Sequence, residues 1–208
     1  MNITILSVGK IKDKWFAAAQ DEYEKRISRF AKLRIVELAD EAAPKNASAK
    51  DIENLMKKEG PDAGGAAYNE RTAQAGTSTN RQGKVSLRAY GSMTYAAVLS
   101  MCSAKLDRGD PRVRQSLEYM TKHWSIDENP GMGSQGLYYF YDIMARALSA
   151  AKVDIVGGHD WKKELSRKII SLQKPDGSWY NDNNRFWESD PVLCTSFAML
   201  VLELCRER

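Results

Sequence analysis

The sequence places a group of aromatic residues where they could form a surface for an apolar ligand. Tyr138, Tyr139 and Tyr141 lie within a run of four aromatic residues, and consecutive helical positions point all around a helix. At least two of these rings are therefore expected to face inward. With Tyr95 and Trp187 they are candidate contacts for an apolar ligand. Aromatic faces can also stabilise a positive charge. The alternative is that the rings fill the space between packed helices.

Two further groups of residues are candidates for a catalytic site. Asp190 and Cys194 stand four positions apart and can share one side of a helix, but zinc catalysis needs about three clustered protein ligands. The two histidines, His123 and His159, are not close to them in the sequence. We therefore interpret Asp190 as a helix cap and Cys194 as a packing residue, and we expect no metal or other cofactor.

A glycine pattern could indicate nucleotide binding. Gly131, Gly133 and Gly136 have the GxGxxG spacing, which holds phosphates when it joins a strand to a helix. Residues 124–130, which precede it, do not have a strand pattern. The sequence therefore favours a turn between helices at this position.

The elements that position these residues differ between the two parts of the chain. In residues 1–60 strands and helices alternate, which is typical of the start of a parallel α/β sheet. On the first helix, Trp15, Ala19, Tyr23, Ile27 and Phe30 recur at helical spacing and form one apolar face. The predicted order is strand 3–8, helix 13–30, strand 33–38 and helix 48–59, with Gly60 as its C-terminal cap.

After Gly60 the pattern changes to a long loop, residues 61–89, and then to helices. Asp110 and Asp160 are predicted helix caps. A glycine-containing loop, an apolar helix and a shorter amphipathic helix recur with a period of roughly 50 residues, which indicates stacked helix pairs. The predicted helices are 92–105, one that begins at Asp110 and Pro111, 137–150, 160–173 and 190–205.

The loop after the fourth helix carries Gln173, Gly177 and Trp179, a spacing that resembles the Gln–Trp repeat of squalene and hopene cyclases and prenyltransferase-like proteins. The resemblance covers residues 61–205 and implies an α/α toroid. In that family the glutamine caps an outer helix and the tryptophan stacks beneath it, so a structural role is implied for both residues. An isoprenoid-like ligand is also implied. The Asp-x-Asp-Asp motif of the cyclases does not occur in the sequence, and Asp127-Glu128 is the nearest acidic pair.

A second resemblance rests on residues 3–10, 21–26 and 33–38 and continues to Gly60. These residues resemble the N-terminal part of SPOUT-class methyltransferases, which modify a pseudouridine in large-subunit ribosomal RNA. That family binds S-adenosylmethionine in a knotted C-terminal segment with a Gly-Gly-Pro-Glu-Gly-type loop. The sequence contains no such loop. Ribosomal RNA is thus an implied partner only under this hypothesis, without an implied cofactor site.

The composition of the chain excludes few classes of protein. The net charge is +4, and residues 1–60 carry 12 Lys and Arg against 10 Asp and Glu, so charge alone does not indicate nucleic-acid binding. The N-terminal apolar run is too short for a signal peptide, and no stretch approaches the roughly 20 apolar residues of a membrane span. Three cysteines without CxxC spacing indicate reduced thiols. We expect a cytoplasmic protein without a membrane span.

We therefore predict a mostly α-helical protein, with a short, truncated βαβα segment (1–60) followed by α-hairpin repeats of a partial α/α toroid (61–208). Our first functional hypothesis is a toroid protein that is non-catalytic or binds an apolar, isoprenoid-like ligand. One alternative is a SPOUT-class ribosomal RNA methyltransferase that lacks the S-adenosylmethionine site. A second is an active terpenoid cyclase or prenyltransferase, and the sequence leaves open whether any catalysis remains.

We also expect self-association. An open array of two and a half helix pairs cannot close on itself, and its last helix has no outer partner. Apolar patches left exposed in this way usually mark interfaces. The apolar residues of that helix are Val192, Leu193, Phe197, Leu200, Val201 and Leu204.

Overall fold

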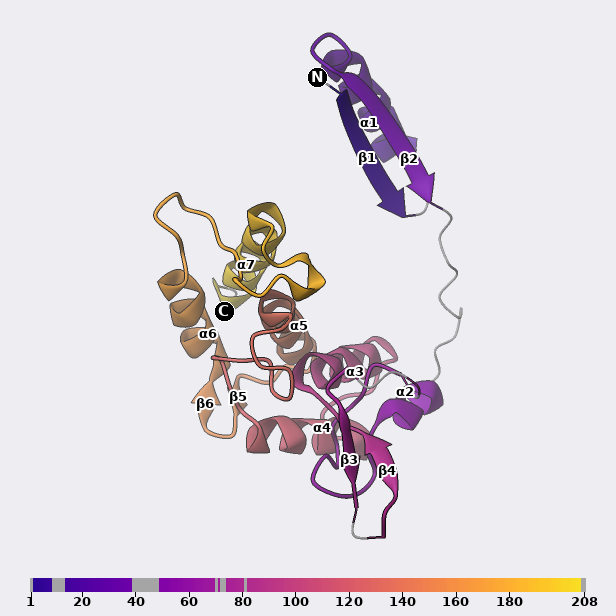
Figure 1. Cartoon of the computed structure of the whole chain (residues 1–208), viewed down its shortest axis with the longest axis vertical. Coiled ribbons are helices and arrows are strands. Elements are labelled where there is room, and N and C mark those ends of the chain that lie inside the picture. Colours follow the sequence, from indigo (N-terminus) through magenta and orange to yellow (C-terminus); the bar gives the residue numbers. More distant parts are fainter. Residues whose placement is uncertain are drawn as a thin grey trace. The chain divides into compact units, whose positions relative to one another are not determined.

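The computed structural model describes residues 2–8, 14–38, 49–69, 71, 74–80 and 82–206 (Figure 1). The chain divides into two compact units, Met1–Ala47 and Ser48–Arg208. The change in sequence character that we placed at Gly60 therefore lies inside the second unit, which is called the helical unit below. Helix α2 (Ala49–Leu55) belongs to it because Ile52 and Met56 are buried and α2 contacts α3 (Gly91–Ser103).

The N-terminal unit is a single strand–helix–strand element. Strands β1 (Asn2–Val8) and β2 (Lys32–Leu38) pair in parallel, with Asn2 opposite Lys32 and Val8 opposite Leu38. Helix α1 (Lys14–Ile27) connects them. Parallel strands require such a crossover connection, so the order predicted from the sequence and the observed pairing have the same physical basis.

The aromatic residues of the α1 face reach solvent within this unit. Trp15, Tyr23 and Phe30 are 71%, 63% and 82% exposed, whereas Ala19 and Ile27 are half-buried. A sheet of two strands spaced about 4.8 Å apart is narrower than a helix of about 10 Å diameter, so it covers only part of the helix surface. The exposed rings follow from that narrow sheet.

The helical unit is built around a row of three apolar helices. Helix α5 (Leu137–Ala150) packs against α3 and against α7 (Pro191–Arg206), and Figure 1 shows it between them. Ten of its residues are buried, which is expected for a helix surrounded by others. Helix α4 (Pro111–Lys122) packs on α3, and α6 (Trp161–Ser171) packs on α7.

Local interactions fix where these helices begin. The Asp110 side chain accepts a hydrogen bond from the backbone N–H of Arg112, and Pro111 occupies the first turn of α4. The Arg112 guanidinium also donates to this carboxylate and holds the pKa of Asp110 down at about 2. Asp160 caps α6 in the same way by accepting from Lys163 N–H.

Two short hairpins complete the helical unit. Strands β3 (Thr77–Thr79) and β4 (Val85–Leu87) pair antiparallel inside the segment that the sequence presents as a long loop. Strands β5 (Ile155–Val156) and β6 (His159–Asp160) form the second hairpin before α6. In the part of the chain that the structure describes, no helix is long and apolar enough to span a membrane.

Candidate functional site

The helical unit contains a cavity of about 410 Å³ with aromatic walls. Its rings come from separate parts of the chain. One belongs to the loop before the β3–β4 hairpin, one directly precedes α3, and the others lie on α5, on α7 and on the short 3-10 helix η1 (Arg185–Trp187). Apolar side chains complete the lining. The rings are Tyr68, Tyr90, Tyr139, Phe186 and Phe197, and the apolar side chains are Met93, Met132 and Leu193.

A buried carboxylate, Glu188, also lines the cavity and is only 1% exposed. It accepts hydrogen bonds at 2.8 Å from the backbone N–H of Tyr139 and from the side-chain amide of Asn181. Glu188 therefore caps the N-terminus of α5, where Gly136 offers no side chain. Burial raises the pKa of its carboxyl, and these hydrogen bonds act in the opposite direction.

One wall of the cavity holds an unusual backbone. Phe186 and Trp187 both adopt left-handed conformations, with φ of 68° and 65°. Two consecutive bulky residues in this region are strained, and such strain persists only where the surroundings impose it. Phe186 lies against Gly136, where an added Cβ would come within 3.3 Å of the ring. The left-handed turn thus places Phe186 in the cavity wall.

The tyrosine hydroxyls of the cavity wall are neutral hydrogen-bonding groups. Burial, together with the neighbouring Tyr139 and Tyr68, raises the pKa of Tyr90 to about 12, so its hydroxyl stays neutral and can donate. Burial likewise raises the pKa of Tyr139. Among the described residues that line the cavity there is no His, Lys or Cys, but the lining includes the carboxyl of Glu188 and the hydroxyl of Ser92.

The candidate ligand contacts from the sequence fall in three places. Tyr139 lines the cavity. Tyr95, Tyr138 and Tyr141 are at most 2% exposed and belong to the core instead, because α5 is surrounded on several sides. Trp187 is 79% exposed and points away from the core. The cavity residues that sequence reasoning missed most clearly are Tyr68, Tyr90 and Glu188, which no local pattern brings together.

The Gln–Trp residues form a compact turn after α6. Gln173 donates from its amide to the carbonyl of Gly177 at 3.0 Å. Trp179 is buried, and its indole N–H donates to the carbonyl of Ile169 at 2.8 Å. The loop is thereby tied to the last turn of α6. A structural role for these three residues remains our interpretation.

The other candidate motifs are held in structural contacts. Gly131, Gly133 and Gly136 all have positive φ and form the turn before α5. Asp190 accepts from Val192 N–H at the start of α7, and the buried Cys194 thiol contacts the carbonyl of Glu188. Within the described residues no group of three or more His, Cys, Asp or Glu could hold a metal ion.

The N-terminal unit presents a second candidate, a basic surface that we call the basic segment. From residue 25 to residue 36 the sequence has five cations and no acidic residue. All five side chains are exposed, and only one of them forms an ion pair among the described residues, Arg26 with Glu22. The exposed ring of Phe30 lies among them. The cations are Lys25, Arg26, Arg29, Lys32 and Arg34.

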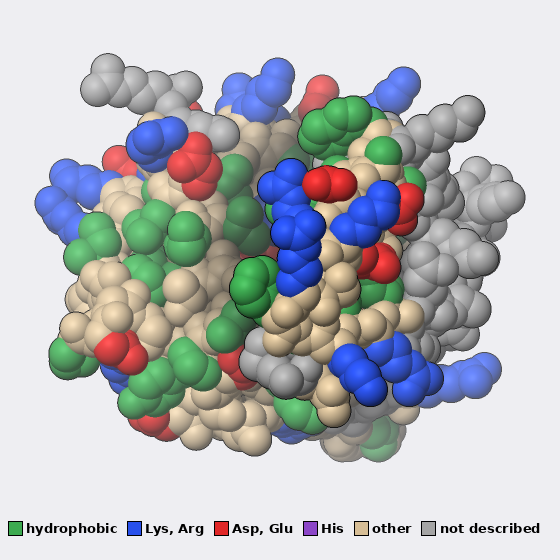
Figure 2. Space-filling view, turned by 90° about the horizontal axis from the view of Figure 1, so that it is seen from above, with side chains coloured by type: hydrophobic (Ala, Val, Ile, Leu, Met, Phe, Trp, Pro, Cys, Tyr) green, Lys and Arg blue, Asp and Glu red, His purple; other side chains and the backbone are tan. Residues whose placement is uncertain are grey.

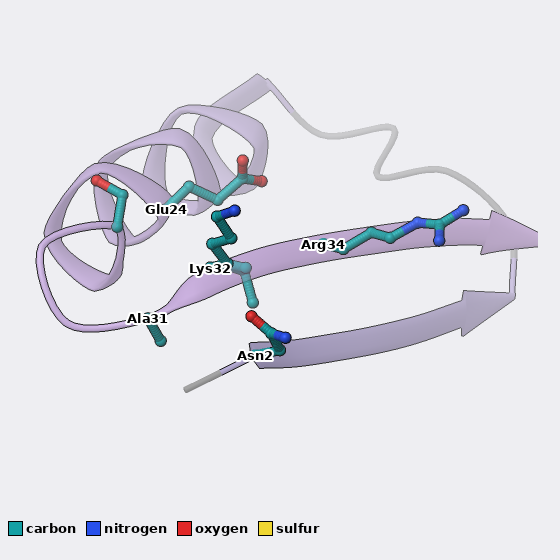
Figure 3. Close-up of a pocket in the computed structure, with 7 residues that line it drawn as sticks. Asn2, Glu24, Ala31, Lys32 and Arg34 are labelled. Atoms are coloured by element: carbon teal, nitrogen blue, oxygen red, sulfur yellow. The ribbon is translucent and has the colours of Figure 1, made fainter.

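An open hollow of about 640 Å³ lies beside the basic segment, between the end of α1 and the two strands. Figure 3 shows Lys32 and Glu24 extending into the space between α1 and β2, while Arg34 lies along β2. Glu24 accepts from Gln20 one turn earlier at 2.7 Å. The hollow is polar and open, which suits an extended polar partner better than an enclosed small molecule.

Comparison with known proteins bears on the N-terminal part of the chain. Residues 1–86 match the family described as predicted SPOUT methyltransferases. The resemblance of the N-terminal residues to this class is therefore confirmed. The match covers less than half of the chain.

The chain is similar to several proteins named ribosomal RNA large subunit methyltransferase H. The protein of Clostridium botulinum type A (strain Hall) is 57% identical over 60 residues, and that of Clostridium botulinum strain Alaska E43 is 60% identical over 60 residues. The protein of Clostridium perfringens strain SM101 is 55% identical over the same length. Each alignment covers 29% of this chain and 38% of the relative.

The chain thus spans well under half the length of the curated relatives it matches. No solved structure matches the chain. Because these relatives are methyltransferases, they give no support to the resemblance of residues 61–205 to α/α-toroid proteins, which remains a prediction.

Proposed function

We propose that the N-terminal unit gives this chain an affinity for large-subunit ribosomal RNA. The observation that carries the proposal is the basic segment, with its cations and the ring of Phe30 all exposed. It lies within the part of the chain that matches SPOUT methyltransferases, and the relatives named above are methyltransferases of large-subunit ribosomal RNA.

Both kinds of side chain suit RNA. Lys and Arg contact the phosphate backbone, and each such contact releases counterions, which makes binding sensitive to salt. Exposed aromatic rings stack on unpaired bases, worth about 1–3 kcal/mol per base. Arg29, Phe30 and Lys32 combine the two within four positions of the chain.

The proposal covers RNA binding and does not extend to methyl transfer. The SPOUT class holds S-adenosylmethionine in a knotted sheet segment, but among the described residues the only parallel strand pair is β1–β2. The regular elements of the described chain after Leu87 are helices and two-residue strands. The described residues therefore do not fit S-adenosylmethionine.

The test is a filter-binding titration of the full chain with a fragment of large-subunit ribosomal RNA. We expect the triple variant Arg29→Gln, Lys32→Gln, Arg34→Gln to bind more weakly. Its dependence of log K on log salt should be shallower by about 2, at about 0.7 for each lost contact with single-stranded phosphate. S-adenosylmethionine should leave the affinity of the wild-type chain unchanged.

The matched control removes three exposed cations from the helical unit, Arg108→Gln, Lys122→Gln and Lys163→Gln. It should retain wild-type affinity and the wild-type salt dependence. Equal losses in the two triple variants would show that RNA responds to total charge, and would contradict a specific role for the N-terminal unit.

We propose a second function for the helical unit, the binding of an apolar small molecule by a partial α/α toroid. The observation that favours it is the aromatic cavity, whose volume lies within the range of roughly 300–1,000 Å³ of small-molecule sites. The row formed by α3, α5 and α7 supports the toroid class. Saturable binding of a neutral long-chain alcohol would support this function, and no binding would contradict it.

A further inference from the structure

The rim of the cavity carries a cation, Arg185. Its Nη2 donates to Oε1 of Gln74 at 2.6 Å, and Gln74 lines the cavity. Its Nη1 donates to Oε1 of Gln135 at 2.5 Å. The guanidinium carbon lies 5.2 Å from the ring centre of Phe186, which forms part of the cavity wall. The side chain of Arg185 is exposed, so it stands where the cavity meets solvent.

The two charged groups near the cavity, Glu188 and Arg185, differ in how accessible they are to a ligand. The carboxylate of Glu188 is occupied by the first turn of α5 and by Asn181. The contacts recorded for the Arg185 side chain within the described residues are to neutral amides and to a ring. Neutral amides neutralise neither charge, but Arg185 is exposed whereas Glu188 is only 1% exposed. Among the described residues, a ligand in the cavity therefore meets apolar rings inside and the exposed positive charge of Arg185 at the mouth.

The backbone holds this cation in place. Arg185 N–H donates to Oδ1 of Asn183 at 3.0 Å, and the two residues that follow Arg185 are the left-handed Phe186 and Trp187. Asn183 also donates from its amide to the hydroxyl of Ser134 at 3.2 Å. The hydrogen bonds of Asn183 and the strained residues after Arg185 restrict the backbone of Arg185. Such preorganisation reduces the entropy lost on binding.

We infer that the cavity binds a long-chain amphiphile with a single carboxylate head, its chain among the aromatic rings and its head on Arg185. The planar guanidinium matches a carboxylate through two parallel N–H donors, which an ammonium or an alcohol cannot use. Tyr68 and Tyr90 supply further hydroxyls in the cavity wall. The inference rests on the proposed apolar-ligand function of the helical unit and names its ligand class.

The experiment is a calorimetric titration of the full chain with three probes of equal chain length at neutral pH: dodecanoate, dodecanol and dodecyltrimethylammonium. We expect dodecanoate to bind most tightly. Arg185→Gln should weaken dodecanoate about tenfold or more, as expected for loss of a charged hydrogen bond, and should leave dodecanol unchanged. The control Arg167→Gln, at an exposed arginine of α6, should change neither.

The outcomes separate the two proposals. If none of the probes binds, the apolar-ligand function is wrong. Equal binding of all three, or tightest binding of the ammonium probe, would leave that function standing and overturn the carboxylate inference. If Arg185→Gln weakened dodecanoate and dodecanol by the same factor, Arg185 would not bind the head and the inference would also fall.

Discussion

Tyr95 carries a hydroxyl group that has no hydrogen-bond partner among the described residues, although the side chain is completely buried. Burial raises its pKa far above the ordinary value, so the hydroxyl stays neutral. Tyr141 in the same core is equally buried, but its hydroxyl donates to the carbonyl of Ile126 at 2.7 Å. The two tyrosines therefore differ in whether the energy of desolvation is offset by a hydrogen bond.

This difference predicts opposite effects of the same substitution. Tyr95→Phe removes an unpaired hydroxyl and should raise the free energy of unfolding by about 1 kcal/mol. Tyr141→Phe removes a hydrogen bond and leaves a carbonyl unpaired, so it should lower the free energy of unfolding by about 1 kcal/mol. Urea unfolding followed by circular dichroism measures both. A destabilised Tyr95→Phe would mean that the hydroxyl has a partner.

The sequence identifies the aromatic residues of α5 but not which of them faces the cavity. The helix period places Tyr138, Tyr139 and Tyr141 on different sides of α5, but it does not say which side faces a cavity. Tyr68 and Phe197 lie 129 positions apart in the sequence and line the same cavity. Contacts of that separation follow from tertiary packing, which no local pattern encodes.

The side chain of Trp179 binds the loop that follows α6 back to that helix. The buried ring of Trp179 donates to Ile169 in the last turn of α6, and its backbone N–H donates to the hydroxyl of Thr195 on α7. A single residue thus connects two helices. Gln173 contributes a further hydrogen bond, but it is exposed.

We therefore expect Trp179→Ala to lower the free energy of unfolding by about 3–5 kcal/mol, the usual cost of removing a large aromatic ring from a core. The comparison variant Gln173→Ala should cost only about 0.5–1.5 kcal/mol, since it loses one exposed hydrogen bond. Thermal unfolding of both variants is the measurement. An unchanged melting temperature in Trp179→Ala would contradict a packing role for the ring.

Elements with a strong local signal agree closely between sequence and structure. The apolar run 137–150 gives the bounds of α5, and Asp110 and Asp160 each accept the capping hydrogen bond that was expected. The β3–β4 hairpin was missed, because strands of three residues rich in Ser and Thr show no alternating apolar pattern. The helix predicted for residues 48–59 is shorter in the structure, where α2 ends at Leu55.

The molecule exposes apolar side chains on both of its units, and Figure 2 shows hydrophobic groups at the surface among Lys and Arg. On α7, Val192, Met199 and Leu200 are 75%, 62% and 45% exposed, whereas Val201 is buried against the rest of the helical unit. The apolar side expected for this helix is thus divided between the core and solvent.

Self-association through the outer side of α7 remains our prediction. Light scattering at micromolar concentration should show a mass above that of the monomer, and Met199→Glu with Leu200→Glu should restore the monomer because charges oppose burial of that side. Val85→Glu, at an exposed position of β4, should not change the mass. A wild-type chain that stays monomeric would contradict the prediction.

Helix α2 has a consequence for how such a chain could arise by exchange of gene segments. The family match runs through α2 to residue 86, yet Ile52 and Met56 are buried in the same core as α3. The residues that match the family and the residues of the compact N-terminal unit therefore end at different positions in the chain. A segment exchanged up to residue 60 would bring α2 with it, and its Ile52 and Met56 would have to fit a core that the rest of the chain supplies.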